Sequence, residues 1–357
     1  MNTTPTAQCS RKPQRHNPAL AGLAVTALAV AVAWLCPTTA FANYDRKVVS
    51  PADHAAEKLG AQYRQQQWTR LAHNNDRDSL IAAVLLGMPN DSFADPLDGQ
   101  ADVEERLAAK FGRDADAIFT LVLACQAQKE PCTHPEYYDE LVRIAPDNAV
   151  NWFVLPNAAA PNAAQLHAAA TAPMADSHLQ TDTRILRTAL ADQPASAVVL
   201  GVDPRELAAS LRRNAVDEVP QPFYHPVVRL CRPPTHATPT DCIELGRRLI
   251  ADRSGTLLAR MIGGTMVRRL EKGTPEAASD KELRRDYVWM DEQLGDSDGS
   301  YLEQVQRDTI DLGEWAAHQR AVERIGKSST PPAGWMPSNP QLLLLSEERT
   351  DLPNQTH

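Results

Sequence analysis

Beyond residue 42 the chain has four cysteines, which form two close pairs, Cys125 with Cys132 and Cys231 with Cys242. Four cysteines allow three pairings, and the local one costs the least loop-closure entropy. Each pair brackets a turn-forming stretch, so each disulfide would join the end of one helix to the start of the next. Loops of this size contribute about 2–3 kcal/mol each in the chain-entropy model. The spacing therefore predicts two local disulfides.

A structural zinc site is the rival interpretation of the second pair. The side chains that could supply two nitrogens and two sulfurs are His225, Cys231, His236 and Cys242. Their spacing matches no usual zinc pattern. The first 42 residues, described next, also indicate export, and thiols in an exported chain normally oxidise. Disulfides are therefore favoured, and neither a metal nor another cofactor is predicted.

The first 42 residues have the three parts of a secretory signal peptide. A basic region precedes an apolar run over 19–36, and Ala40 and Ala42 satisfy the small-x-small rule for signal peptidase. Cleavage would leave Asn43 as the N-terminus. The run is also just long enough for an uncleaved membrane anchor, but the cleavage pattern and the helix-breaking Pro37 favour removal. We therefore expect a periplasmic or secreted protein with no membrane attachment after processing.

The charge of the processed chain excludes two classes of partner. Removal of residues 1–42 takes away three basic residues and no acid, which leaves 33 Lys and Arg against 45 Asp and Glu. An acidic chain without a basic cluster has no electrostatic footprint for nucleic acid or anionic lipid.

The apolar composition predicts an all-α protein. Alanine and leucine dominate, aromatic residues make up 5% of the chain, and β-branched residues are sparse. Alanine and unbranched side chains lose little rotamer freedom in a helix. Periodicity and capping residues predict helices over 51–72, from 78, and over 101–111, 114–127, 133–145, 162–171, 181–192, 203–214, 241–251, 254–270, 283–294 and 300–325.

Local sequence features also predict caps and boundaries. Thr133 and Glu136 form a capping box, and Ser300 with Glu303 forms another. Gly263-Gly264 inside a helix predicts a closely packed neighbour. A proline-rich stretch over 220–239 separates the two halves. The expected organisation is a signal peptide over 1–42 and an N-terminal helical-repeat region over 43–219. A C-terminal helical region over 220–327 could continue the same array, and 328–357 would form a tail or surface strap.

Three segments begin alike, at offsets of 38 and 32 residues that are typical of two-helix repeats: 78–85, 116–123 and 148–155. The segment 145–152, Ala-Pro-Asp-Asn-Ala-Val-Asn-Trp, resembles the repeat junction of tetratricopeptide proteins, which opens the first helix of a unit. Pro156 departs from that family, which has a small residue there. The resemblance implies a degenerate tetratricopeptide-like or Sel1-like array of antiparallel helix pairs. The chain also resembles exported helical proteins of Xanthomonas-type bacteria, which implies no particular activity.

Two patterns suggest catalysis, and both have a simpler explanation. Residues 295–299, Gly-Asp-Ser-Asp-Gly, fit the G-x-S-x-G pattern of hydrolases. That motif needs a strand before its serine, whereas an amphipathic helix precedes this one, so a helix–helix turn is favoured. Glu136 and Glu140 share a helical face, but near Arg143 they are more typical of a solvated surface. No catalytic residue is therefore predicted.

The overall prediction is an exported helical-repeat protein that binds a protein or peptide partner, because repeat arrays build extended concave faces. A periplasmic immunity or inhibitor protein and a cell-wall hydrolase with a helical site are the alternatives. Four tryptophans could line a groove, although aromatic residues at helical spacing more often lie in the core: Trp68, Trp152, Trp289 and Trp315. The pattern indicates neither the ligand nor the oligomeric state.

Overall fold

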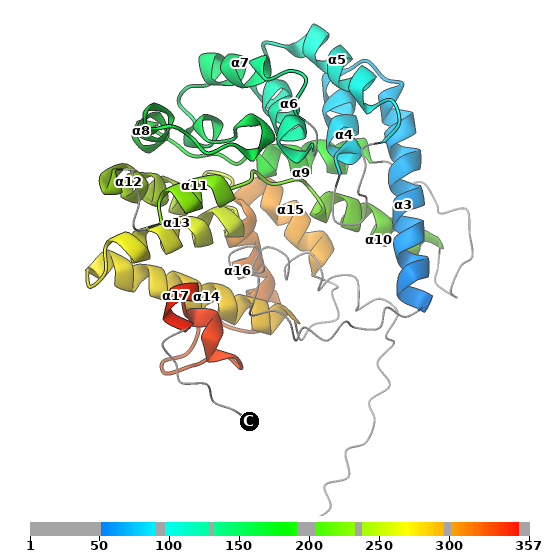
Figure 1. Ribbon diagram of the computed structural model, residues 1–357. Coiled ribbons are helices and arrows are strands. Elements are labelled where there is room, and N and C mark those ends of the chain that lie inside the picture. The colour runs from blue at the N-terminus through cyan, green and yellow to red at the C-terminus, as the bar shows by residue number, and fades with distance from the viewer. Residues whose placement is uncertain are drawn as a thin grey trace, which may run out of the picture.

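The computed structural model describes residues 51–89, 97–128, 131–190, 204–232, 238–295 and 301–349, and in these ranges all regular elements are helical (Figure 1). This confirms the predicted all-α class. The two predicted local disulfides are confirmed as well. The signal peptide, its cleavage site at Ala42 and Asn43, and Ser297 of the G-x-S-x-G pattern lie outside the described residues.

Two largely apolar helices, α4 and α6, form the centre of the N-terminal half. The helices of this half are α3 (Pro51–Ala72), α4 (Arg77–Gly87), α5 (Gln100–Phe111), α6 (Ala115–Ala127), α7 (Glu136–Ile144), α8 (Ala163–Thr171) and α9 (Leu179–Ala189), with the 3₁₀ helices η1 (Ala149–Trp152) and η2 (Pro156–Ala158). Residues 79–87 of α4 and 117–126 of α6 are buried throughout. A helix that is apolar on all sides must be surrounded by others, and α3, α5 and α9 pack on α4 while α5 and α7 pack on α6.

The C-terminal half packs onto this core through three helices. Its elements are α10 (Pro204–Asp217), α11 (His225–Leu230), α12 (Pro239–Ile250), α13 (Leu257–Leu270), α14 (Pro275–Gly295), α15 (Leu302–Leu312), α16 (Glu314–Arg324), η3 (Pro340–Leu343) and α17 (Ser346–Arg349). α12 packs on α8, α15 packs on α9, and α10 contacts α3, α9 and α15. The larger hydrophobic core runs from Tyr63 to Met266, across the predicted boundary at 219–220. A second cluster surrounds Trp289 and Trp315.

Glycine allows two of the C-terminal helices to approach closely. A Cβ atom on Gly246 would lie 2.9 Å from the backbone oxygen of Gly263, and a Cβ on Gly263 would lie 2.9 Å from the backbone nitrogen of Ile250. Side chains at either position would push α12 and α13 apart. The close neighbour that the Gly263-Gly264 pair predicts is therefore α12.

Three sequence predictions about helix ends are wrong. The predicted helix over 300–325 is two helices, α15 and α16, which are separated at Gly313. Gly313 has φ 84°, and the backbone amides of Glu314 and Trp315 donate to carbonyls of residues 254 and 255 rather than within one helix. Thr133 does not cap α7, because that helix begins after Pro135 and Glu136 contacts His134 instead. The helix expected from residue 254 begins after Thr256, whose hydroxyl caps it.

Both disulfides connect consecutive helices. Cys125 near the end of α6 bonds Cys132 in the connection to α7, with Cα atoms 5.0 Å apart. Cys231, which directly follows α11, bonds Cys242 of α12 at 5.6 Å. Cysteines joined in this way cannot ligate zinc, and no metal-binding group of side chains occurs in the described part of the chain. The disulfides are consistent with an oxidising compartment.

The C-terminal segment, residues 328–349, lies along α13 and α14. Trp335 packs edge-on against Trp289 with ring centroids 5.1 Å apart. Leu343 and Leu345 are buried, and Arg268 of α13 donates to the carbonyl of Leu343 at 3.0 Å. This segment is thus fixed to the surface of two helices through its tryptophan and leucine residues.

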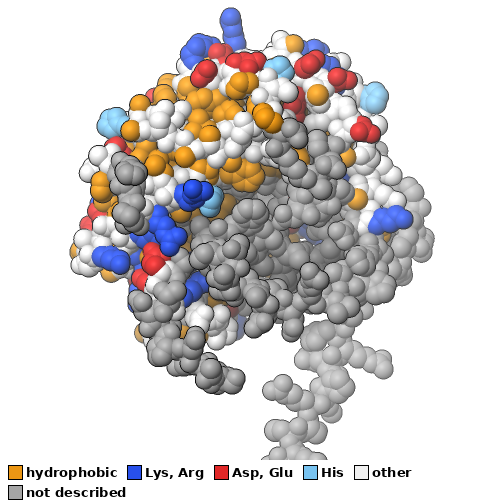
Figure 2. All heavy atoms as spheres, in the orientation of Figure 1, with side chains coloured by type: hydrophobic (Ala, Val, Ile, Leu, Met, Phe, Trp, Pro, Cys, Tyr) orange, Lys and Arg blue, Asp and Glu red, His pale blue; other side chains and the backbone are white. Residues whose placement is uncertain are grey.

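On the face shown in Figure 2, apolar side chains gather over α6, α7 and α8, and charged side chains lie around them. Within the ranges that the structure describes, the helices are all too short or too polar to cross a membrane.

Candidate ligand pocket

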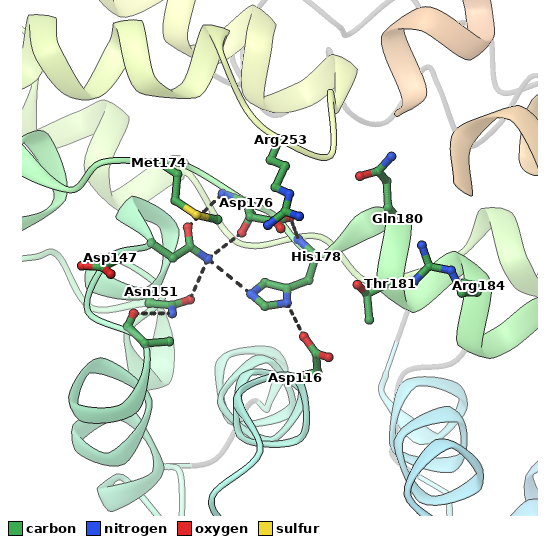
Figure 3. Close-up of a pocket in the computed structure, with 12 residues that line it drawn as sticks. Asp116, Asp147, Asn151, Met174, Asp176, His178, Gln180, Thr181, Arg184 and Arg253 are labelled. Carbon is green, nitrogen blue, oxygen red and sulfur yellow. Dashed lines mark hydrogen bonds and ion pairs between the residues drawn. The ribbon is translucent and has the colours of Figure 1, made fainter. Parts of the chain in front are cut away.

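A pocket of about 450 Å³ lies between the starts of α6 and α9, the η1 turn and the loop before α13 (Figure 3). Its lining is mainly polar and consists of Asp116, Ala145, Asp147, Asn148, Asn151, Met174, Asp176, His178, Gln180, Thr181, Arg184 and Arg253. Ligand sites commonly have this size and combine a shaped cavity with a few convergent polar groups.

His178 occupies the floor of the pocket. It immediately precedes α9 and has φ 62°, a left-handed conformation that a residue with a side chain adopts only when its surroundings impose it. Its Nδ1 lies 3.0 Å from Oδ1 of Asp116, and its Nε2 lies 3.3 Å from Nδ2 of Asn148. The ring stacks on Phe119 of α6 with centroids 4.0 Å apart. One face and both nitrogens of this buried imidazole are therefore held by neighbouring side chains.

The orientation of the Asn148 amide follows from its hydrogen bonds. Its Oδ1 accepts from the backbone amides of Val150 at 3.1 Å and Asp176 at 2.8 Å. One hydrogen of its Nδ2 is donated to the carbonyl of Asp176 at 2.8 Å, and the other is shared between Oδ1 of Asn151 at 3.2 Å and Nε2 of His178 at 3.3 Å. Because Nδ2 is a donor, a neutral His178 must accept from it through Nε2 and donate through Nδ1 to Asp116.

Asp116 is held as a carboxylate by two partners. The hydrogen bond from His178 is the main cause that lowers its pKa, and the charge of Arg77 lowers it further against the effect of burial. Arg77 reaches Oδ2 of Asp116 at 2.5 Å and Oδ2 of Asp114 at 2.8 Å. Burial lowers the pKa of His178, but the bond to Asp116 and the nearby charges of Asp176 and Asp182 outweigh it, so this pKa is raised.

A second buried carboxyl group lies behind the histidine. Asp182 is one helical turn after His178 and is only 2% exposed. Burial raises its pKa to about 7, and the negative charges of Asp116 and Asp176 act in the same direction. Its Oδ1 has no hydrogen-bond partner in the described part of the chain. The group is therefore largely protonated just below neutral pH.

The upper wall of the pocket is the loop before α13. Asp252 is buried and accepts from the backbone amides of Ser177 at 2.9 Å and Thr256 at 3.0 Å. Asp176 accepts from Oγ of Ser254 at 2.6 Å, and the backbone amide of Arg253 donates to the carbonyl of residue 175 at 2.8 Å. These contacts join two loops that are about 75 residues apart in the chain.

The structure brings one predicted feature to this site and leaves the others elsewhere. The tetratricopeptide-like junction supplies Asp147, Asn148 and Asn151 to the pocket, but it forms a 3₁₀ turn rather than opening an α-helix. Glu136 and Glu140 lie on the outer surface of α7, and Glu140 pairs with Arg143 there. His178 and Arg253 have no local motif and are missed by the sequence analysis.

The tryptophans line no common groove in the described structure. Trp68 is buried in the larger core and donates to Gln100 at 3.0 Å. Trp289 and Trp315 belong to the second cluster. Trp152 donates to the carbonyl of Pro146 at 2.8 Å, close to the pocket but outside its lining.

Comparison of the chain with protein-family models finds no match, and the comparisons with curated proteins and with solved structures find none either. The function therefore has to be inferred from the site itself.

Proposed function

We propose that this chain is an exported binding protein that takes a polar segment of a peptide or protein partner into the pocket at His178. The proposal depends on one observation: a pocket of about 450 Å³ whose floor is held in place by hydrogen bonds among Asp116, Asn148 and His178. A floor that is ordered before binding lowers the entropic cost of holding a ligand. Export is supported by the leader-like sequence and by the two disulfides.

Binding explains this site better than catalysis does. A general base needs a ring nitrogen within reach of the substrate. In neutral His178, Nδ1 donates to Asp116 and Nε2 accepts from Asn148, so neither nitrogen is available without breaking a contact. The pocket lining contains no serine or cysteine. The histidine is therefore a group that shapes the floor.

Site-specific photocrosslinking tests this proposal. A photoreactive phenylalanine analogue replaces Thr181, which lines the pocket, and in a matched control it replaces Asp102, which is exposed on α5. Both variants are expressed with the full leader, irradiated in intact cells and compared by mass spectrometry. We expect a partner that crosslinks from position 181 and not from position 102. Equal crosslinking at both positions, or none at position 181, would contradict the proposal.

A further inference from the structure

The rim of the pocket carries both signs of charge in side chains that are not paired with each other. Arg184 on α9 and Arg253 in the loop before α13 line the pocket and are exposed, and so is Asp147 before η1. Among the described residues, the side chains of these three form no ion pair. In Figure 3, Asp147 lies at one end of the view and Arg184 at the other, while Arg253 points down between them.

The floor cannot supply the specific contacts, because its polar atoms already have partners. Asn148 donates one amide hydrogen to Asp176, shares the other between Asn151 and His178, and accepts from two backbone amides. Asn151 donates to the carbonyl of residue 145 at 3.0 Å. Recognition is therefore left to the charged groups of the rim and to the hydroxyl of Thr181.

This arrangement disfavours ligands that carry only positive or only negative charge. A simple anion that approaches Arg253 also meets the carboxylate of Asp176, which lies beside it in Figure 3, and a simple cation that approaches Asp176 meets that guanidinium group. A ligand with a positive and a negative end separated by polar groups fits both. Guanidinium groups match a carboxylate through paired hydrogen bonds.

We infer that the pocket binds a short peptide with free ends, with its amino group at Asp147 and its carboxylate at Arg184 and Arg253. The inference rests on the proposed binding function and specifies its ligand. A volume of about 450 Å³ suits a peptide of a few residues. Thr181 lines the pocket between His178 and Arg184 in Figure 3, and we expect the middle side chain of the peptide to matter less than its two charged ends.

Isothermal titration calorimetry with capped and uncapped peptides tests the inference on the oxidised protein. The probes are tripeptides Ala-X-Ala that vary in the middle residue, each with free ends, with an acetylated amino end or with an amidated carboxyl end. We expect either cap to weaken binding about tenfold or more, because it removes one charge-assisted contact. Equal affinity for capped and free peptides would overturn the inference.

Variants assign each end of the peptide to its partner. Arg253→Gln should weaken binding of the free peptide about tenfold but leave the amidated peptide unchanged, since that peptide has no carboxylate to lose. Asp147→Asn should weaken the free peptide and not the acetylated one. Arg143→Gln and Asp139→Asn on α7 are matched controls outside the pocket, and neither should alter binding.

The two proposals fail in different ways. If no tripeptide binds but position 181 still crosslinks to a partner, the ligand class is wrong and the binding function stands. If position 181 captures nothing and the peptides also fail to bind, both are wrong. If the caps weaken binding equally in the wild type and in both rim variants, the assignment of the ends is wrong.

Discussion

The side chain of Asn148 shows how much of the pocket depends on a single amide. It connects the η1 turn, the segment before α9 and the imidazole of His178. The contacts to Asn151 and His178 are buried and the contact to Asp176 is partly buried, and a buried polar group that loses its partner keeps the full cost of leaving water. The shape of the pocket therefore depends on hydrogen bonds of residues that need not contact the ligand.

Asn148→Ala should lower the free energy of unfolding by about 2–3 kcal/mol, because it leaves backbone groups at Val150 and Asp176 without partners. Urea unfolding followed by circular dichroism measures the change. Asn75→Ala is the control, since Asn75 is exposed and its side chain accepts a surface hydrogen bond from Lys110. A loss of equal size in both variants would contradict this account of the amide.

Asp182→Asn should remove part of the pH dependence of stability. The pKa of Asp182 is about 7 in the folded protein, whereas an aspartate in an unfolded chain titrates near 4. Between these values the folded protein still holds a proton that the unfolded chain has released, so stability falls as the pH rises. Asparagine cannot ionise, and the variant should gain stability relative to the wild type from pH 4 to 7.

The measurement is the urea midpoint of both proteins across that range, with the surface variant Asp139→Asn as the control. The curves of wild type and Asp182→Asn should diverge as the pH rises and then run parallel above pH 7. Parallel curves throughout would show that Asp182 does not titrate in this window.

At the scale of elements, replacing two different glycines by alanine should change stability in opposite directions. Gly263 lies at the crossing of α12 and α13, whereas Gly60 lies in α3. Gly263→Ala should destabilise the protein by about 1–3 kcal/mol, because its Cβ would overlap the backbone of α12. Gly60→Ala in α3 has open space around it and should stabilise by about 0.5–1 kcal/mol through helix propensity. Thermal and urea unfolding of the two variants give the comparison. Two shifts of the same sign would contradict the close crossing.

Local patterns predicted most helices and missed those that depend on distant contacts. α4 and α6 follow from an aspartate cap and an apolar run, both contained within a few residues. The stripe from Leu302 to Ala316 continues past Gly313, so nothing local shows that residues 254 and 255 interrupt it. α11 begins at His225 inside the proline-rich stretch that the sequence predicts as the division between the halves, and its Pro226 suits a first helical turn.

The pocket was predictable only in part, for the same reason. Asn148 lay in a segment with a recognisable pattern, although the resemblance suggested a helix start and not a binding floor. His178 is a lone histidine in sequence, and its partners Asp116 and Asn148 are 62 and 30 residues away. No spacing rule connects residues that meet only through tertiary packing.

At the scale of the whole molecule, the buried acids should set the pH of greatest stability. Burial raises the pKa of Asp252 and Asp280 to about 6 and that of Asp182 to about 7. All three favour the folded state more strongly as the pH falls toward 5. The melting temperature should therefore rise from pH 8 to pH 5.5, as differential scanning calorimetry can show. A maximum at pH 8 would contradict these assignments.

The disulfides should also contribute to the whole fold. Replacement of both Cys231 and Cys242 by alanine should cost about 2–3 kcal/mol, because the unfolded chain regains the freedom of the closed loop. Urea unfolding measures the loss, and the wild type purified from the periplasm should expose no thiol to a thiol reagent in denaturant. Reactive thiols in that sample would contradict both the pairing and the proposed export.

The loop before α13 connects the pocket to the start of α16, which lies far along the chain. The carbonyls of residues 254 and 255 are held by residues 314 and 315, and the same loop supports the segment that carries His178. A growing polypeptide lacks that support until the residues of α16 have been made. If the protein is exported and binds its ligand at His178, as we propose, the pocket would stay empty during passage across the membrane and would become competent only after the last helices had arrived on the other side.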